Sequence, residues 1–149
     1  MSREGSIETI VVPLDGSDSS FQAAEFAVKL AKMSGARLIL THAVVNPPYV
    51  DFTTAGIMVT HYIDEAKKNA EKWYAKVGEI ASKEGVEYTS ETILDVASVA
   101  DTIINHAESK KADMIVIGTH GRTGLKRFLI GSVASGVVAH AKCSVLVVR

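Results

Sequence analysis

The sequence predicts an α/β fold, in which one parallel sheet of five strands carries helices on both faces. Two observations lead to this prediction. Short and nearly continuous apolar runs, such as residues 10–14 and 114–117, are typical of strands that are buried on both faces. Segments of helical periodicity lie between these runs, so that strands and helices alternate along the chain. Such alternation requires right-handed crossovers and therefore a three-layer α/β/α sandwich.

The first part of the chain contains two expected strands and the helix between them. Residues 7–14 form the first strand. The helix that follows is predicted to begin with a capping box made by Ser19 and Gln22. Gly35 is expected to end this helix, because glycine readily adopts the left-handed conformation of a helix stop. The second strand is predicted over residues 37–45.

An irregular segment separates the second strand from a long amphipathic helix. Residues 49–60 have no clear period, and we expect them to form a loop over one end of the sheet. The helix is predicted to start at Ile57 or Tyr62 and to continue to Lys83, with one apolar stripe that packs in the core or in an interface. That stripe contains Tyr62, Ala66, Ala70, Trp73, Val77, Ile80 and Ala81.

The second half of the chain continues the alternation. Apolar and polar residues alternate over 86–94, which indicates a strand that is covered on one side and lies near an edge of the sheet. The remaining strands are predicted at residues 112–117 and 144–148, and a helix is predicted over 132–141. A further helix is marked by Val99, Ile103 and Ala107.

The composition fits one domain and argues against several classes of function. The 149 residues are 47% hydrophobic and 22% charged, so we expect a single domain over residues 1–149. A net charge of −1 gives no electrostatic footprint for nucleic acid or for an anionic membrane. The apolar runs are too short to span a bilayer and the N-terminus is polar, so we expect a cytoplasmic location. One cysteine, Cys143, allows no internal disulfide.

The most specific signal is a set of glycines after the fourth expected strand. Gly118 is followed after two residues by Gly121 and, nine residues later, by Gly131 and Ser132. Glycines allow the backbone to approach a ligand closely, and exposed N–H groups at a helix N-terminus favour an anion. The spacing matches neither the dinucleotide-binding motif nor the P-loop, and no lysine precedes Ser132. We therefore expect backbone amides and a hydroxyl to hold phosphates here.

A second unusual loop, residues 13–17, follows the first strand. Parallel sheets bind ligands at the carboxyl ends of their strands, where the strand order reverses. If the first and fourth strands are neighbours, this loop and residues 118–124 line one crevice. Asp15 is then either a ligand contact or the acceptor of an Asx-turn. Ser132 could also be a helix N-cap, since the two roles are compatible.

These motifs together resemble the universal stress protein family, and in particular its ATP-binding subclass. The subclass motif Gly-x₂-Gly-x₉-Gly-[Ser/Thr] is matched by Gly118, Gly121, Gly131 and Ser132. The Pro-x-Asp end of the first strand, the His-Ala-Val end of the second strand and the terminal Ser-Val-Leu-Val-Val fit as well. The resemblance covers essentially the whole chain and implies the strand order 3-2-1-4-5.

The resemblance also implies an ATP site with Mg²⁺ or Mn²⁺. Asp15 would lie near the ribose, and Ala43 would meet the adenine through its backbone. Ile117 and Gly118 would line the ribose side. The phosphates would be held by Gly121, Gly131, Ser132 and Val133, and the predicted site is completed by Pro13 and Arg122. Arg122 either meets a phosphate or is solvated.

Three functions stay open. The first is an ATP-binding regulatory module whose nucleotide state is recognised by an unidentified protein partner, with little or no turnover, because the phosphate loop contains no carboxylate or glutamine to orient water. The second is an enzyme, either a slow or autophosphorylating ATPase or an AMP-forming ligase. The third is a structural or protein-binding member that no longer holds nucleotide. The family also implies a homodimer through residues 145–148, an apolar edge that favours pairing.

Three of the five histidines, His61, His106 and His140, show no metal-ligand spacing with each other. His42 and His120 are interpreted as structural or solvated, although His120 lies inside the phosphate loop and could touch a ligand. The remaining histidines, His61, His106 and His140, are expected at the surface or at helix ends.

Overall fold

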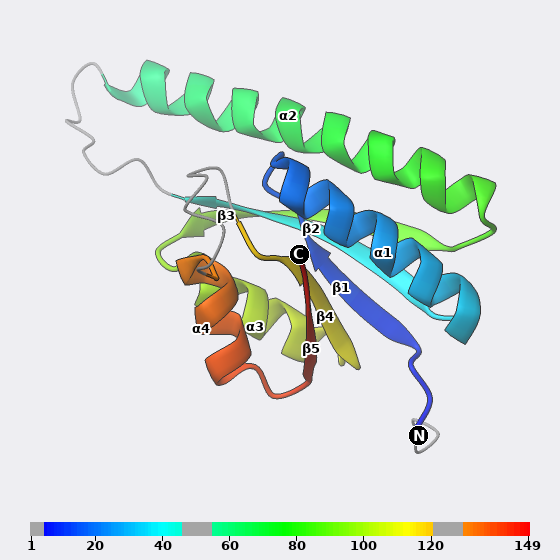
Figure 1. Ribbon diagram of the computed structural model, residues 1–149. Helices are drawn as coiled ribbons and strands as arrows, with labels where there is room; N and C mark the ends of the chain where they lie inside the picture. The colour runs from blue at the N-terminus through cyan, green and yellow to red at the C-terminus, as the bar shows by residue number, and fades with distance from the viewer. Residues whose placement is uncertain (1–4, 46–54, 121–129) are drawn as a thin grey trace.

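The computed structural model describes residues 5–45, 55–120 and 130–149 (Figure 1). Its elements are β1 (Thr9–Pro13), α1 (Asp18–Ser34), β2 (Arg37–Val45), α2 (Ala55–Lys83), β3 (Tyr88–Val96), α3 (Val99–Ser109), β4 (Met114–Gly118), α4 (Ser132–His140) and β5 (Ser144–Val148). All strand pairs are parallel and the order is β3-β2-β1-β4-β5. Both the predicted fold class and the strand order are thus confirmed.

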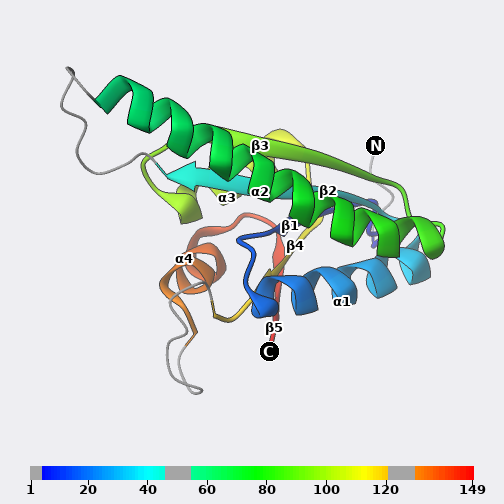
Figure 2. The same cartoon turned by 90° about the horizontal axis from the view of Figure 1, so that it is seen from above.

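The sheet separates two apolar cores, one under each pair of helices. Along β1, the side chains of Ile10 and Val12 join the core under α1 and α2, whereas Val11 joins the core under α3 and α4. All three residues are fully buried. This alternation is the reason why β1 has a continuous apolar sequence, since a central strand faces a core on both sides. Figure 2 shows the two helical layers on opposite faces of the sheet.

The start of α1 differs from the predicted capping box. Ser17 is the N-cap, with an extended backbone, and its Oγ accepts a hydrogen bond from the amide of Ser20 at 3.1 Å. Ser19 already lies in the first helical turn, where its Oγ accepts from the amide of His120 at 3.2 Å. The capping prediction for Ser19 was therefore wrong by two residues. The predicted stop is confirmed, because Gly35 has a φ of 78° at the C-cap.

Helix α2 begins at Ala55, earlier than the pattern predicts, so that residues 55–60 are helical and not part of a loop. At 1.5 Å per residue its 29 residues extend for about 43 Å, whereas five-residue strands such as β1 and β4 extend for about 17 Å. The helix therefore passes beyond the carboxyl ends of these strands (Figures 1 and 2). Because the first part of α2 extends past the sheet, only the later part of the predicted apolar stripe is covered. Ala70 and Val77 are buried, whereas Tyr62 is 46% exposed.

Strand β3 occupies one edge of the sheet, as the alternating pattern predicts, but it runs from Tyr88 to Val96 and so ends two residues later than expected. Strand β1 is shorter than the predicted 7–14. The amide of Leu14 nevertheless still donates to the carbonyl of Thr41 at 2.7 Å, which holds the end of β1 against β2. Within the described ranges, no helix combines the length and the apolar composition needed to cross a membrane.

Candidate functional site

A cleft of about 510 Å³ opens at the carboxyl ends of β1, β2 and β4. Its volume lies within the range of small-molecule binding sites. The residues predicted from the sequence that line it are Pro13, Asp15, Ala43, Ile117, Gly118, Gly131, Ser132 and Val133. Two further predicted residues, Gly121 and Arg122, lie outside the described residues. The structure therefore brings together every predicted site residue that it describes.

The cleft forms because β1 and β4 are neighbours, with Ile10 opposite Met114 in the sheet. The loop after β4 is joined directly to the start of α1, since the amide of His120 donates to Ser19 Oγ at 3.2 Å, and the carbonyl oxygen of His120 lies 3.4 Å from Ser17 Oγ. The amide of Gly131 donates to the carbonyl of Thr119 at 2.7 Å and so holds the start of α4 beside the end of β4. The crevice expected between the two loops is thus present.

Asp15 occupies the turn between β1 and α1. Its Oδ1 accepts hydrogen bonds from the amide of Ser17, at 2.9 Å, and from the Ser17 hydroxyl. Gly16 between them has a φ of 82°, a conformation that residues with a side chain rarely adopt. The Asx-turn interpretation of Asp15 is therefore confirmed, and the same residue also lines the cleft.

The N-terminus of α4 has no side-chain cap. Its N-cap residue is Gly131, whereas α1 and α3 are capped by the hydroxyls of Ser17 and Ser98. Ser132 is the first helical residue and not the N-cap. The amides of a helical first turn have no partner within the helix. In α4 the residues of that turn line the cleft, so its partial positive charge is available to an anionic group there.

Gly118 has a structural reason to be glycine. A Cβ atom at this position would lie 2.6 Å from the backbone oxygen of Ser19 and 2.8 Å from its carbonyl carbon. The φ of Gly118 is not positive, so the close approach of α1, and not the backbone conformation, requires the missing side chain. The first glycine of the motif therefore lets the end of β4 pack closely against the first turn of α1.

Several cleft residues are absent from the sequence-based prediction. The overhanging half of α2 contributes Tyr62, Glu65, Ala66 and Asn69, and α3 contributes Val99 and Ile103. The α2 residues have the i, i+3, i+4, i+7 spacing of one helix face, which is the signal that could have found them. His42 also lines the cleft, but it is buried, its Nδ1 lies 2.7 Å from the carbonyl oxygen of Leu14, and its ring meets Trp73 edge-on. The structural interpretation of His42 is confirmed.

A model of the universal stress protein family matches residues 6–149. The chain belongs to the universal stress protein family. A relative in Methanocaldococcus jannaschii, also a universal stress protein, is 39% identical over 148 residues, which cover 98% of this chain and 84% of the relative. The universal stress protein UspA from Lactobacillus plantarum is similar in structure, with a TM-score of 0.88 at 25% identity over 97% of this chain and 99% of that one.

A third similar protein of the family was solved in complex with cAMP. Its TM-score to this chain is 0.61 at 27% identity, and the match covers 97% of this chain and 98% of that one.

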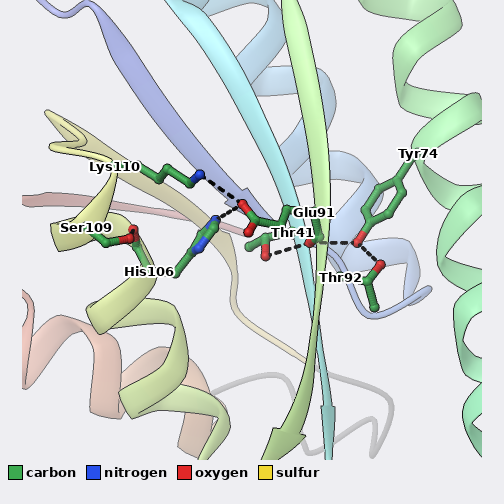
Figure 3. Close-up of polar contacts among 7 residues, drawn as sticks. All are labelled: Thr41, Tyr74, Glu91, Thr92, His106, Ser109 and Lys110. Atoms are coloured by element: carbon green, nitrogen blue, oxygen red, sulfur yellow. Dashed lines mark hydrogen bonds and ion pairs between the residues drawn. The ribbon is translucent and has the colours of Figure 1, made fainter.

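This member of the family also contains a polar cluster outside the cleft, between β3 and α3 (Figure 3). Glu91 on β3 forms an ion pair with Lys110, in which Oε2 lies 3.1 Å from Nζ. The same oxygen lies 3.7 Å from Nε2 of His106. His106 lies in the last turn of α3, so its expected place at a helix end is confirmed, but it is only 8% exposed because it lies on the inward face of the helix, next to the buried Ala107.

The carbonyl oxygen of Glu91 accepts hydrogen bonds from the hydroxyl of Thr41, on the side of the sheet that carries α3, and from the hydroxyl of Tyr74, on the side that carries α2, both at 3.0 Å (Figure 3). Because the Tyr74 hydroxyl donates its proton to Glu91, the hydroxyl of Thr92, 2.8 Å away, donates to Tyr74. Burial raises the pKa of Tyr74 to about 12, which keeps the phenol neutral and able to donate. The cluster attaches α2 to the sheet.

The stability of the protein is expected to fall below about pH 6.5 because of His106. Burial lowers the pKa of His106, and Lys110 adds to this effect while Glu91 opposes it. The folded state therefore binds fewer protons than the unfolded state, so the stabilisation is present above the unfolded pKa of about 6.5 and is lost as the pH falls through the folded pKa. We expect urea midpoints of His106→Gln to depend less on pH between 6.5 and 5 than those of the parent protein.

The exposed His140 gives the matched control, since His140→Gln should retain the pH dependence of the parent protein. Parallel pH profiles for His106→Gln and the parent protein would contradict the prediction.

Proposed function

We propose that this single-domain chain is an ATP-binding universal stress protein, a regulatory module with little or no turnover whose nucleotide state is recognised by a protein partner. The observation that supports this most strongly is the convergence of separate chain segments, the ends of β1, β2 and β4 and the start of α4, on one cleft. The uncapped N-terminus of α4 lies in that cleft, where its free amides suit a phosphate. The relative solved with cAMP is consistent with a nucleotide ligand.

The same cleft suits a nucleotide whose metal ion is bound mainly through the phosphates. Among the described residues, no group of three or more His, Cys, Asp or Glu side chains could hold a metal ion. Mg²⁺ in proteins commonly keeps several waters and bridges one or two carboxylates to substrate phosphates. Mg²⁺ or Mn²⁺ would then arrive with ATP, and Asp15 is the lining carboxylate on the β1 side.

The experiment that tests this function is titration calorimetry of the nucleotide-stripped protein with ATP and Mg²⁺, repeated with ADP, AMP and GTP. The expected result is saturable ATP binding at one site per chain, with steady-state hydrolysis well below about 1 per second, a typical enzyme rate. No binding heat and no thermal shift, in a folded sample free of retained nucleotide, would contradict the proposal. Turnover at about 1 per second or faster would favour the enzyme alternative.

We further propose a homodimer in which β5 of one protomer pairs with β5 of its partner. Strand β5 is at an edge of the sheet, and its apolar residues Val145–Val148 are only half-buried. Helix α1 packs beside β5 and exposes Phe26 at 46% and Met33 at 85%. An unpaired apolar edge of this kind favours association with another strand. If two copies pair their β5 strands about a two-fold axis, neither copy leaves this edge unpaired.

Leu146→Lys is expected to weaken this dimer, because it places a charge in the paired strand. Sedimentation velocity at about 10 to 50 μM chain should then detect mainly monomer. Leu146 also packs against the core, as does Ile80 of α2, which packs on β2 and β3 at the other end of the sheet from β5, so Ile80→Lys is the matched control for lost core packing. A dimer that persists in folded Leu146→Lys, or one that Ile80→Lys weakens equally, would count against the β5 interface.

A further inference from the structure

The overhanging half of α2 presents a polar face to the cleft. Tyr62, Glu65 and Asn69 line the cleft from this helix, together with Ala66. Tyr62 is half-exposed, so its ring has a surface that no part of the described core covers. Glu65 is exposed, and within the described part of the chain no hydrogen bond or ion pair engages its carboxylate. These side chains are therefore available to a ligand.

The two walls of the cleft differ in charge. Helix α2 packs on β2 and β3, whereas α4 packs on α3 and β5, so the two helices bound the cleft from opposite faces of the sheet. The α4 wall ends in uncapped amides with a partial positive charge. The α2 wall carries the Glu65 carboxylate, and the described lining residues include no lysine or arginine. An anionic ligand group is thus favoured at α4 and disfavoured at α2.

The other carboxylate that lines the cleft, Asp15, accepts hydrogen bonds from the amide and the hydroxyl of Ser17. The polarity of the two helical walls therefore favours a nucleotide with its phosphates at α4 and its base at α2. A carboxylate only accepts hydrogen bonds, so it favours a base edge that donates. We propose that Glu65 makes the site selective for a base with an exocyclic amine, while Tyr62 provides a flat surface on which the ring stacks. This inference rests on the nucleotide-binding function proposed above.

The test compares AMP with purine riboside 5′-monophosphate, which is the same nucleotide without the amine. In calorimetry, the parent protein is expected to bind AMP about tenfold more tightly, because a hydrogen bond to a charged group is lost in the analogue. Glu65→Ala should weaken AMP binding about tenfold and leave the analogue unchanged, so that the two nucleotides become equal. Glu65→Gln retains an acceptor oxygen and should keep part of the preference.

Two further variants distinguish a direct contact between Glu65 and the base from a general electrostatic effect of a nearby carboxylate and from stacking of the base on Tyr62. Asp64→Ala removes a neighbouring exposed carboxylate that does not line the cleft, and it should leave both affinities unchanged. Tyr62→Ala should weaken both nucleotides by a similar factor, about tenfold, since stacking does not depend on the amine. Thermal melting of each variant checks the fold.

The outcomes distinguish this inference from the function on which it rests. If the parent protein binds neither nucleotide and does not bind ATP with Mg²⁺ either, both the proposed function and the role of Glu65 are overturned. If it binds both nucleotides with equal affinity, or if Glu65→Ala weakens both equally, nucleotide binding stands and the selectivity assigned to Glu65 is overturned.

Discussion

Gly118→Ala is expected to lower the free energy of unfolding by about 2 to 3 kcal/mol, the cost of forcing extra atoms into a packed site. The added methyl group would lie 2.6 Å from the backbone oxygen of Ser19, and backbone in the first turn of α1 cannot move aside as a flexible side chain can. For a chain of this length the melting temperature should fall by roughly 5 to 10 °C. Differential scanning calorimetry of the nucleotide-free protein measures the change.

Gly56→Ala is the matched control, because it makes the same chemical change where nothing lies within 4 Å of the new Cβ atom. Gly56 lies in α2, and alanine in a helix is favoured over glycine by roughly 0.5 to 1 kcal/mol. The control should therefore melt at the same temperature as the parent protein or slightly above it. If Gly118→Ala melts together with Gly56→Ala, the close packing of α1 against the end of β4 is not what requires glycine at this position.

Ser132→Asp is expected to weaken ATP binding at least about tenfold, or 1.4 kcal/mol, while leaving the free protein equally or more stable. Ser132 is the first residue of α4, and its side chain is exposed in the cleft. An aspartate there repels phosphates at short range. The same aspartate interacts favourably with the helix dipole, which stabilises a fold by about 0.3 to 1 kcal/mol. Calorimetry with ATP and Mg²⁺ and thermal melting without ligand measure the two effects.

The opposite signs make this prediction specific, since a variant that merely damaged the fold would lose both affinity and stability. Ser132→Asn has nearly the shape of the aspartate without its charge, and its side-chain amide can still donate to a phosphate, so it should bind ATP much more tightly than Ser132→Asp does. Equal affinities for the Asp and Asn variants would place the phosphates away from the start of α4.

Much of the candidate site could be predicted from the sequence because its parts are local signals. A buried strand followed by a turn, as at Pro13 and Asp15, places a polar group at the carboxyl end of that strand wherever the strand lies in the sheet. The glycines and Ser132 that lead into α4 indicate a helix start near backbone that can approach an anion closely. The resemblance to a family then connected these segments in one strand order.

Local signals failed where two distant segments decide the environment of a residue. The pattern around Ser19 allows a capping box, yet the loop after β4 engages its hydroxyl and Ser17 caps the helix. The local pattern placed His106 at a helix end but gave no sign that it is buried, because its partner Glu91 comes from β3. Gly118 has the spacing of a binding motif, but its contact with α1 is visible only in the folded chain.

The α/β class, the alternation of elements and the residues at strand ends follow from the amino-acid sequence, since they depend on periodicity and on turn chemistry within a few residues. That α2 extends past the sheet and forms a wall of the cleft, with Glu65 opposite the uncapped start of α4, is visible in the folded chain alone. The physical reason is that an amphipathic period specifies which face of a helix is apolar. It does not specify how far along the helix a sheet of finite length is present to cover that face.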